Sequence, residues 1–262
     1  MTDPVVYTLD QRGVATVTLN RPEVGNAYNG AVIDGLLEAM DTLAKRRELR
    51  VVLLTGNGKH FQAGADLKWI RQVKGSSPSE NERVSRATAE AVDRLNRLPV
   101  PTVALVQGGC FGGGTGIVAA CDVVIAADNA VFSISEVRWG LTAAIIIPQL
   151  SDAISARQLR RYALTGERFD AAEARRIGMV HEVVPLDRLA AAGEAMVGHL
   201  LENGPDAIAE TKDWILKSAW GGFDRATFDA LSASHATKRQ SAEADEGLAS
   251  FAEKRSANWR RT

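Results

Sequence analysis

The stretch GGCFGGGTG occupies residues 108–116 and holds six of the 23 glycines in the chain. It follows the apolar run Thr102–Val106, which is typical of a buried strand, and leads into Gly116–Cys121, whose small side chains are typical of a tightly packed helix. Such a turn lets the backbone approach a ligand closely, with the helix N-terminus directed at a polar atom. The stretch fits the dinucleotide fingerprint poorly, because that fingerprint opens the first βαβ unit.

Strands alternate with helices on both sides of this stretch. β-Branched or continuous apolar runs predict strands at residues 5–9, 14–19, 50–56, 102–106 and 123–127. Apolar residues at helical spacing predict helices at residues 29–46, 79–98, 116–121, 157–165 and 170–177. The polar segment from residue 70 is expected to be a mobile loop that runs into the second of these helices. After Pro185 only helical patterning remains, so the sequence predicts an α/β core over residues 1–195 and a helical region over residues 196–262.

The composition argues against several classes of protein. Lys plus Arg total 31 and Asp plus Glu total 32, so the net charge of -1 does not favour a basic nucleic-acid-binding surface. Cys110 and Cys121 lie in apolar stretches, which indicates buried free thiols, and four scattered histidines do not suggest zinc. The apolar runs are too short for a membrane helix, and the first residues do not resemble a signal peptide. We therefore expect a cytoplasmic protein without metal, nucleic-acid or membrane partners.

Two further segments offer residues for chemistry. Residues 61–68, FQAGADLK, form a small-residue loop that opens a helix. This loop is either a tight turn or the source of an outward backbone N–H that serves as an oxyanion donor. Residues 132–141, FSISEVRWGL, place Glu136 among apolar neighbours. This carboxylate is either one half of a surface pair with Arg138 or a partly buried acid–base group.

Taken together and in this order, the three segments resemble those of the enoyl-CoA hydratase/isomerase (crotonase) superfamily. The resemblance runs from residues 19–22 (LNRP), through residues 178–184 (GMVHEVV), to residues 246–255 (EGLASFAEKR). It implies a spiral of ββα turns that binds acyl-CoA over residues 1–195. It also implies that residues 196–262 assemble a homotrimer, or a hexamer made of two trimers. The implied substrate is a coenzyme A thioester, with no prosthetic group or metal.

The resemblance assigns roles to individual residues. The backbone N–H groups of Ala65 and Gly113 correspond to the family's oxyanion hole, which would stabilise a thioester enolate. Glu136 corresponds to its acid–base carboxylate. The implied coenzyme A contacts are Arg21, Asn26, Ala27, Ala63, Asp66, Leu67, Lys68, Phe251 and Lys254, the last two across a subunit boundary. For Lys68 and Lys254, a solvated side chain is the alternative.

Position 116 departs from the family pattern, because hydratases of the best-known type carry a second Glu there. Gly116 either makes room for a branched acyl chain or allows close helix packing. Three activities fit a single Glu136. It could catalyse syn hydration of a 2-enoyl-CoA alone, or shuttle a proton in a Δ3/Δ2 enoyl-CoA isomerase. Alternatively, the fold binds acyl-CoA without turnover. We expect hydration, with the other two as alternatives.

A finer resemblance concerns the substrate. Residues 112–122, 135–141 and 160–169 are similar to those of bacterial 3-methylglutaconyl-CoA and isohexenylglutaconyl-CoA hydratases, which act in branched-chain and terpene breakdown. This implies a β-branched enoyl-CoA, with or without a distal carboxylate. A cation would bind that carboxylate, and Arg138 is the predicted one. The predicted lining of the substrate pocket is Gly116, Arg138, Trp139 and Ala144.

Overall fold

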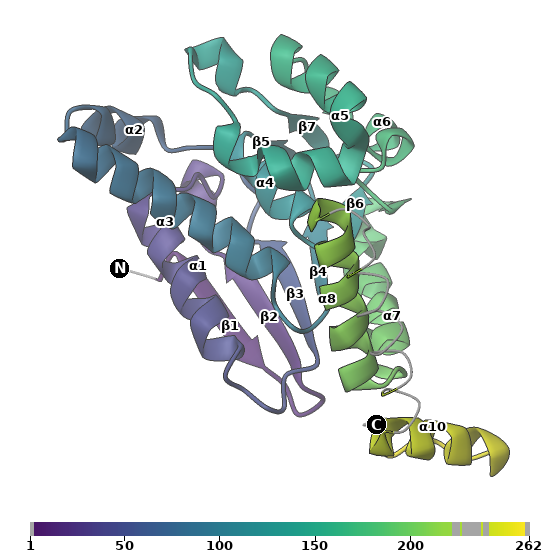
Figure 1. Ribbon diagram of the computed structural model, residues 1–262. Coiled ribbons are helices and arrows are strands. Elements are labelled where there is room, and N and C mark those ends of the chain that lie inside the picture. Colours follow the sequence, from purple (N-terminus) through teal and green to yellow (C-terminus); the bar gives the residue numbers. More distant parts are fainter. Residues whose placement is uncertain (1–2, 222–225, 227–236, 238–240, 260–262) are drawn as a thin grey trace.

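A six-stranded β-sheet organises the fold (Figure 1). The computed structural model describes residues 3–221, 226, 237 and 241–259. The strand order is β1-β2-β3-β4-β6-β9, in which β1 pairs antiparallel with β2 and the other pairs are parallel. The strands are β1 (Val5–Leu9), β2 (Val14–Leu19), β3 (Val51–Gly56), β4 (Thr102–Val106), β6 (Val123–Ala127) and β9 (Glu182–Val184). All five strands predicted from the sequence are present in this sheet.

A second sheet was not predicted. It contains β5 (Gly109–Phe111), β7 (Val131–Ser133) and β8 (Phe169–Asp170), which are too short to give an alternating pattern. Each of β4 and β6 is followed by a strand of this smaller sheet and then by a helix, α4 (Gly113–Ala119) or α5 (Ile147–Thr165). After β3, Gln62 forms an isolated parallel bridge with Cys110 before the chain enters its next helices. The ββα order therefore repeats along the chain, as the resemblance implied.

Helices cover both faces of the larger sheet. Successive side chains of a strand point to opposite faces, so neighbouring residues join different clusters. Val52 of β3 packs in the cluster that contains Leu36 of α1 (Gly30–Leu43). Val51, one residue earlier, packs in a second cluster with Val197 of α7 (Leu189–Leu201). In Figure 1, α1 and α7 accordingly lie on either side of the strands.

The segment after residue 66 is helical, so the mobile loop predicted from residue 70 is wrong. Helix α2 (Leu67–Lys74) begins where the Asp66 carboxylate accepts a hydrogen bond from the Lys68 N–H, at 3.0 Å. Helix α3 (Pro78–Asn96) begins at Ser77, whose hydroxyl accepts from the Glu80 N–H. These caps satisfy N–H groups that a helix start leaves unpaired. Helix α2 extends into the segment where composition suggested a loop, whereas α3 matches the helix predicted at residues 79–98.

The C-terminal part continues with helices α6 (Ala171–Ile177), α8 (Pro205–Gly221) and α10 (Ala242–Ala252). The Lys212 ammonium of α8 donates to the Asp122 carboxylate at 2.7 Å and to the Val100 carbonyl at 3.1 Å, which ties α8 to the core. The predicted boundary between residues 195 and 196 falls within α7, whose apolar side chains pack on the larger sheet. The division of the chain at that point stays a prediction.

Both cysteines are buried free thiols, as predicted. Burial raises the pKa of the Cys121 thiol to about 12, so this group is not a reactive thiolate. In the part of the chain that the structure describes, no three metal-ligating side chains gather in one place. None of the helices in those ranges is both long and apolar enough to cross a membrane.

Candidate active site

Two backbone segments lie side by side at the N-terminus of α4. The Gln62 N–H donates to the Gly109 carbonyl at 3.1 Å, and the Phe111 N–H donates to the Gln62 carbonyl at 2.9 Å. Gly64 has a φ of +92°, and a Cβ there would lie 3.5 Å from the Phe111 carbonyl oxygen. Its positive φ favours glycine, because a side chain is strained there. The structure thus brings together the two glycine-rich loops that the sequence singled out.

Tyr28 fixes the direction of the Ala65 backbone. The Tyr28 N–H donates to the Gly64 carbonyl, the Asp66 N–H donates to the Tyr28 carbonyl, and both distances are 2.9 Å. These bonds pair Tyr28 with Ala65 in a parallel bridge. In a parallel bridge, one residue forms both hydrogen bonds, with the two neighbours of its partner, and the partner's own N–H points away from it. Here Tyr28 forms both bonds and Ala65 is the partner. The Ala65 N–H therefore points away from Tyr28 and is placed to donate to a ligand.

Gly113 begins α4, three residues before the predicted helix start at Gly116. The N–H groups in the first turn of a helix have no acceptor within the helix, and they carry the positive end of its dipole. A Cβ on Gly113 would lie 2.7 Å from Cε1 of Tyr28, so the tyrosine ring packs directly on this helix start. One residue, Tyr28, is therefore in contact with both predicted oxyanion donors, with Ala65 through its backbone and with Gly113 through its ring.

Glu136 places a carboxylate next to this helix start. It begins a short 3-10 helix, Glu136–Trp139, and a Cβ on Gly112 would lie 3.2 Å from its Oε1. Its Oε2 is buried and has no hydrogen-bond partner among the described residues. Burial raises the pKa of the Glu136 carboxyl above its usual range. Burial, together with the nearby negative charge of Glu136, also raises the pKa of Tyr28 to about 12. Of the two predicted alternatives, the structure shows the partly buried carboxylate.

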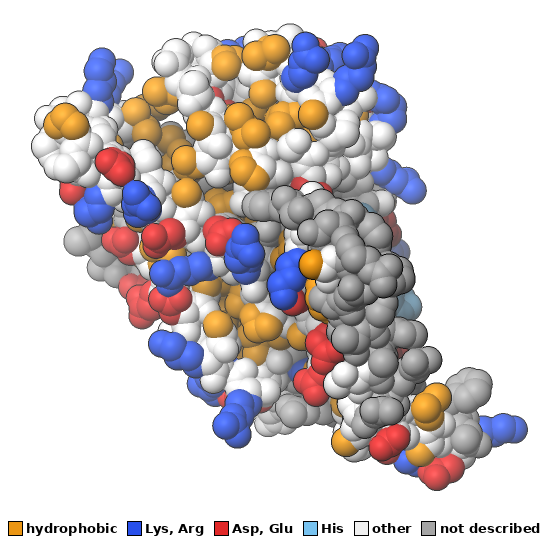
Figure 2. All heavy atoms as spheres, in the orientation of Figure 1, with side chains coloured by type: hydrophobic (Ala, Val, Ile, Leu, Met, Phe, Trp, Pro, Cys, Tyr) orange, Lys and Arg blue, Asp and Glu red, His pale blue; other side chains and the backbone are white. Residues whose placement is uncertain are grey.

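A cavity of about 720 Å³ opens beside Glu136 and Gly113. Its size falls in the range of pockets that hold a drug-sized molecule. Its walls come from α1, α2, α3 and residues 141–146, and Figure 2 shows hydrophobic side chains gathered around the hollow above α3. The buried apolar part of the lining is Val32, Ile33, Leu36, Met40, Ala91, Val92, Leu95, Ile117, Ala143 and Ile146. Among the described lining residues, Glu136 is the only carboxylate and Lys74 the only ammonium.

Gly116 does not make room for an acyl chain. A Cβ on Gly116 would lie 2.2 Å from Cγ2 of Ile146, so the isoleucine side chain occupies the space that a larger residue would need. Ile146 is 2% exposed and lines the cavity, whereas Gly116 does not. Close packing is therefore the alternative that the structure shows, and an apolar wall stands where the best-known relatives carry a second carboxylate.

The other predicted pocket residues divide into two groups. Ala144 lines the cavity, as predicted. The Arg138 side chain instead packs on Gly166, where a Cβ would lie 3.0 Å from its Cγ, and Arg138 does not line the cavity. Trp139 is 64% exposed and also lies outside the lining. The structure thus brings neither Arg138 nor Trp139 to the substrate side of Glu136.

Several predicted coenzyme A contacts bond within the chain. The Asn26 amide donates to the carbonyls of Asn57 and His60 at 2.9 and 2.8 Å, and the side chain is 1% exposed. The Arg21 guanidinium donates to the Ala27 carbonyl at 2.6 Å and pairs with the Asp66 carboxylate at 3.2 Å. These side chains fasten the segment before Tyr28 to the loop that carries Ala65.

The remaining predicted contacts lie nearer the surface. Ala63 is half-buried and its N–H donates to the Gly25 carbonyl at 2.8 Å, whereas Leu67 and Lys68 are exposed in the first turn of α2. Lys254 is exposed just after α10, and Figure 1 shows α10 at the opposite end of the molecule from α2. The Phe251 side chain lies outside what the structure describes. Within one chain, Lys254 is thus far from the cavity.

Sequence reasoning missed three side chains of this site. Tyr28 contacts both donor loops, Ile146 fills the space beside Gly116, and Lys74 is the cation in the lining. Tyr28 directly precedes the N-cap Asn29 of α1, which signals a helix start but not a contact with Ala65 or Gly113. Such contacts depend on segments that are distant in the sequence, so local patterns do not reveal them.

Comparisons with known proteins agree with this geometry. The sequence model of the enoyl-CoA hydratase/isomerase family matches residues 10–262. A putative enoyl-CoA hydratase of Thermus thermophilus is 33% identical over 242 residues, covering 92% of this chain and 95% of the relative. A hydroxycinnamoyl-CoA hydratase-lyase of Pseudomonas fluorescens is 34% identical over 203 residues, covering 76% and 74%.

A solved structure supports the same assignment. The crystal structure of an enoyl-CoA hydratase from Shewanella pealeana superposes with a TM-score of 0.93 at 36% identity, covering 98% of this chain and 96% of that one. The predicted crotonase-type α/β fold is thereby confirmed. With two glycine-rich loops and a partly buried carboxylate assembled at one cavity, the chain belongs to the enoyl-CoA hydratase/isomerase family and is an enzyme of the enoyl-CoA hydratase type.

Proposed function

We propose that the protein adds water across the 2,3 double bond of an enoyl-CoA, with Glu136 as its single acid–base group. The observation that supports this most is the Glu136 carboxylate, which is partly buried beside the N-terminus of α4 and has one oxygen without a protein partner. A carboxylate in this state is placed to bind a water molecule or a substrate hydrogen. The raised pKa of Glu136 suits a group that must both accept and return a proton.

The proposed reaction has two steps. First, Glu136 accepts a proton from water while the water oxygen bonds to the β-carbon, and the π electrons move onto the thioester oxygen. The resulting enolate is stabilised by the N–H groups of Ala65 and Gly113, which are fixed before the charge develops. Glu136 then gives its proton to the α-carbon as the carbonyl re-forms. The product is a 3-hydroxyacyl-CoA, and the carboxylate returns to its starting state.

We propose a β-branched acyl group as the substrate, on the resemblance of residues 112–122, 135–141 and 160–169. The large apolar cavity supports a bulky chain. A chain with a distal carboxylate, as in 3-methylglutaconyl-CoA or isohexenylglutaconyl-CoA, would pair with Lys74, because the predicted partner Arg138 packs on Gly166 instead. This replaces Arg138 by Lys74 in the proposal.

An isomerase is the second candidate. Among the described lining residues, Glu136 is the only carboxylate, and one carboxylate suffices to move a proton between two carbons of a 3-enoyl-CoA. The family itself includes isomerases by its description. The same oxyanion donors would stabilise the dienolate that forms between the two proton transfers.

Ultraviolet absorbance separates these candidates. A 2-enoyl-CoA loses its conjugated absorbance when water adds, whereas a 3-enoyl-CoA gains it on isomerisation. We expect the protein to lower the absorbance of 3-methylcrotonyl-CoA and to release a 3-hydroxyacyl-CoA that mass spectrometry detects. A rise with 3-enoyl-CoA and no change with the 2-enoyl substrate would favour the isomerase. No change with either substrate would contradict both candidates.

The role of Lys74 is tested with two substrates, one whose acyl group carries a distal carboxylate and one whose acyl group does not. We expect Lys74→Ala to lower kcat/KM about tenfold for 3-methylglutaconyl-CoA, because a charge-assisted hydrogen bond is lost. The value for 3-methylcrotonyl-CoA should stay within about twofold. Lys68→Ala, on the same helix but outside the cavity lining, serves as control and should affect both substrates equally. An equal effect of Lys74→Ala on both substrates would remove the carboxylate from the proposal.

We also propose that the chain assembles into a homotrimer or a hexamer through residues 196–262, in the cytoplasm. Two observations support the assembly. Ile215 of α8 and Leu248 of α10 are 60% and 69% exposed, so both offer apolar surface that a neighbouring subunit would bury. Lys254 lies far from the cavity of its own chain, so a coenzyme A contact from it would require a neighbouring subunit.

A further inference from the structure

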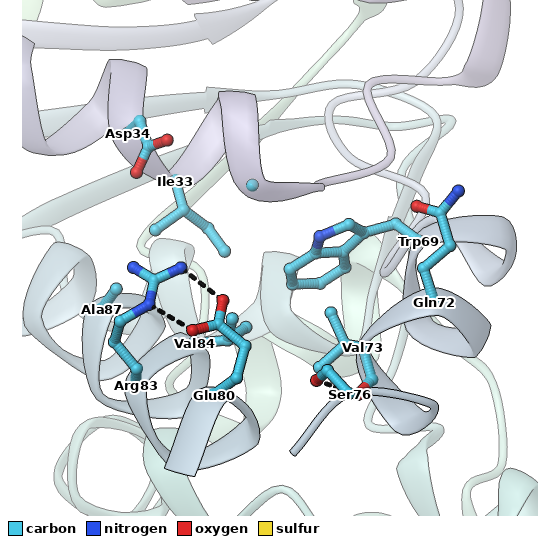
Figure 3. Close-up of a pocket in the computed structure, with 11 residues that line it drawn as sticks. Ile33, Asp34, Trp69, Gln72, Val73, Ser76, Glu80, Arg83, Val84 and Ala87 are labelled. Carbon is cyan, nitrogen blue, oxygen red and sulfur yellow. Dashed lines mark hydrogen bonds and ion pairs between the residues drawn. The ribbon is translucent and has the colours of Figure 1, made fainter. Parts of the chain in front are cut away.

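A second, smaller cavity lies against the first one. It measures about 240 Å³, is open to solvent on one side and is lined by residues of α1, α2 and α3 (Figure 3). Five side chains line both cavities, so the two spaces are neighbours with no further layer of protein between them. The shared residues are Ile33, Trp69, Val73, Ser76 and Val84.

Trp69 is the largest of the shared side chains. It lies on α2, four residues after the proposed oxyanion donor Ala65. Its ring packs edge-on against Tyr28, with 5.7 Å between the ring centroids and 70° between the planes. On the other side, its Nε1 would lie 3.6 Å from a Cβ on Gly30. In Figure 3 the indole of Trp69 and the side chain of Ile33 point into the same space.

The smaller cavity has an apolar interior and a polar rim. Its apolar lining is Ile33, Trp69, Val73, Val84 and Ala87. At the rim, the Arg83 guanidinium donates to the Glu80 carboxylate at 2.7 and 2.8 Å, and both side chains are exposed to water. Asp34 also lines this cavity, so its charged side chains sum to one negative charge and do not attract an anionic group. An alkyl chain whose end reaches solvent fits this environment, since its length is buried and its tip is not.

We propose that the smaller cavity receives the distal part of a long acyl chain, and that Trp69 is the specificity-determining side chain at the junction. This rests on the proposed acyl-CoA function and extends it to the length of the acyl group. The thioester lies at Ala65 and Gly113, the chain follows the larger cavity, and its tail passes Trp69 to enter the space between α1 and α3. Short acyl groups end before the junction and do not reach Trp69.

The number of methylenes that the smaller cavity buries sets the expected change in acyl-CoA affinity. Each methylene removed from water contributes about fourfold to affinity, so a few methylenes in the smaller cavity decide between long and short chains. Filling that cavity should therefore weaken the binding of long chains alone. Ala87 is the residue to change, because it lines the smaller cavity and not the larger one.

The test measures binding of saturated acyl-CoAs to the full chain by calorimetry, with butyryl-, octanoyl- and dodecanoyl-CoA. We expect Ala87→Phe to weaken dodecanoyl-CoA at least about tenfold and to leave butyryl-CoA within about twofold. Ala89→Phe is the matched control, on the same helix but lining neither cavity, and it should change neither affinity. Trp69→Ala, which joins the two cavities, should raise the affinity ratio of dodecanoyl- to butyryl-CoA.

The outcomes distinguish this inference from the function on which it rests. Saturated acyl-CoAs are not hydrated, so their binding does not depend on Glu136 chemistry. If the wild-type chain binds none of the three compounds, the proposed acyl-CoA function fails. If it binds them, but Ala87→Phe leaves dodecanoyl-CoA unchanged or weakens all three equally, the smaller cavity does not hold the chain. A lower ratio in Trp69→Ala would overturn the role of Trp69.

Discussion

Replacing Glu136 with Gln is expected to lower kcat for a 2-enoyl-CoA by at least about a hundredfold. The amide keeps the size of the side chain but does not accept a proton, so water is no longer activated. The proposed oxyanion donors Ala65 and Gly113 are unchanged in this variant, so KM should change much less than kcat. Stopped-flow absorbance with 3-methylcrotonyl-CoA measures both constants. Glu182→Gln, which removes an exposed carboxylate elsewhere, is the matched control.

The pH dependence of the same variant gives an independent check. Burial raises the pKa of Glu136, so kcat/KM should fall as pH drops through that raised value, and the fall should vanish in Glu136→Gln. The free energy of unfolding depends on pH in the opposite direction and falls as the pH rises. The folded state holds the Glu136 proton more tightly than the unfolded state, so Glu136 lowers stability as the pH rises from its unfolded to its folded pKa. Glu136→Gln should remove that loss and unfold at no lower temperature than wild type at neutral pH. Turnover within about threefold of wild type would contradict the assigned role.

Gly113→Ala is expected to lower kcat by about a hundredfold or more. The added Cβ would lie 2.7 Å from Cε1 of Tyr28, so either the ring or the first turn of α4 must move. If the first turn moves, the Gly113 N–H leaves the position where it would meet the enolate oxygen, and if the ring moves, Tyr28 no longer packs on the helix start that holds this N–H in place. Because this donor acts chiefly on the transition state, the loss should appear in kcat more than in KM.

Two further variants show whether the cause is local. Gly198→Ala adds the same methyl group where no atom lies within 4 Å, so it should leave kcat unchanged. Gly113→Ala combined with Tyr28→Leu removes the ring atom that the methyl group meets, and it should recover part of the lost kcat. A folded Gly113→Ala enzyme with wild-type kcat would show that the start of α4 does not bind the developing charge.

The strands and the two glycine-rich loops could be predicted because their causes are local. Strands of the larger sheet that are covered on both faces, such as Val51–Gly56, read as continuous apolar runs, and glycine marks the turns where backbones approach closely. The smaller sheet escaped prediction because its strands have at most three residues. The loop at residues 61–68 was predicted to open a helix, and α2 is that helix. Its continuation past residue 70 escaped because α2 has no buried side chain, so its sequence resembles an exposed loop.

The polar residues of the site could be predicted only in part. Glu136 was recognisable from its apolar neighbours and its order after the donor loops. The side chain of Arg138 packs on Gly166, which is distant in the sequence, so its direction could not be read from residues 132–141. The reason for a glycine at position 116 likewise lies in its contact with Ile146, a residue of another element. Each side-chain position is set by a tertiary contact, which a local pattern does not contain.

The packing of α7 has a consequence for synthesis of the chain on the ribosome. Val51, Val103 and Ile125 form a face of the larger sheet that only a much later helix covers, through side chains such as Val197. The ribosome releases β3, β4 and β6 before α7 has been made, so the nascent sheet presents this apolar face to water in the interval. A chaperone that binds apolar surface, or a pause that delays pairing of these strands, would protect the chain from aggregation until α7 emerges.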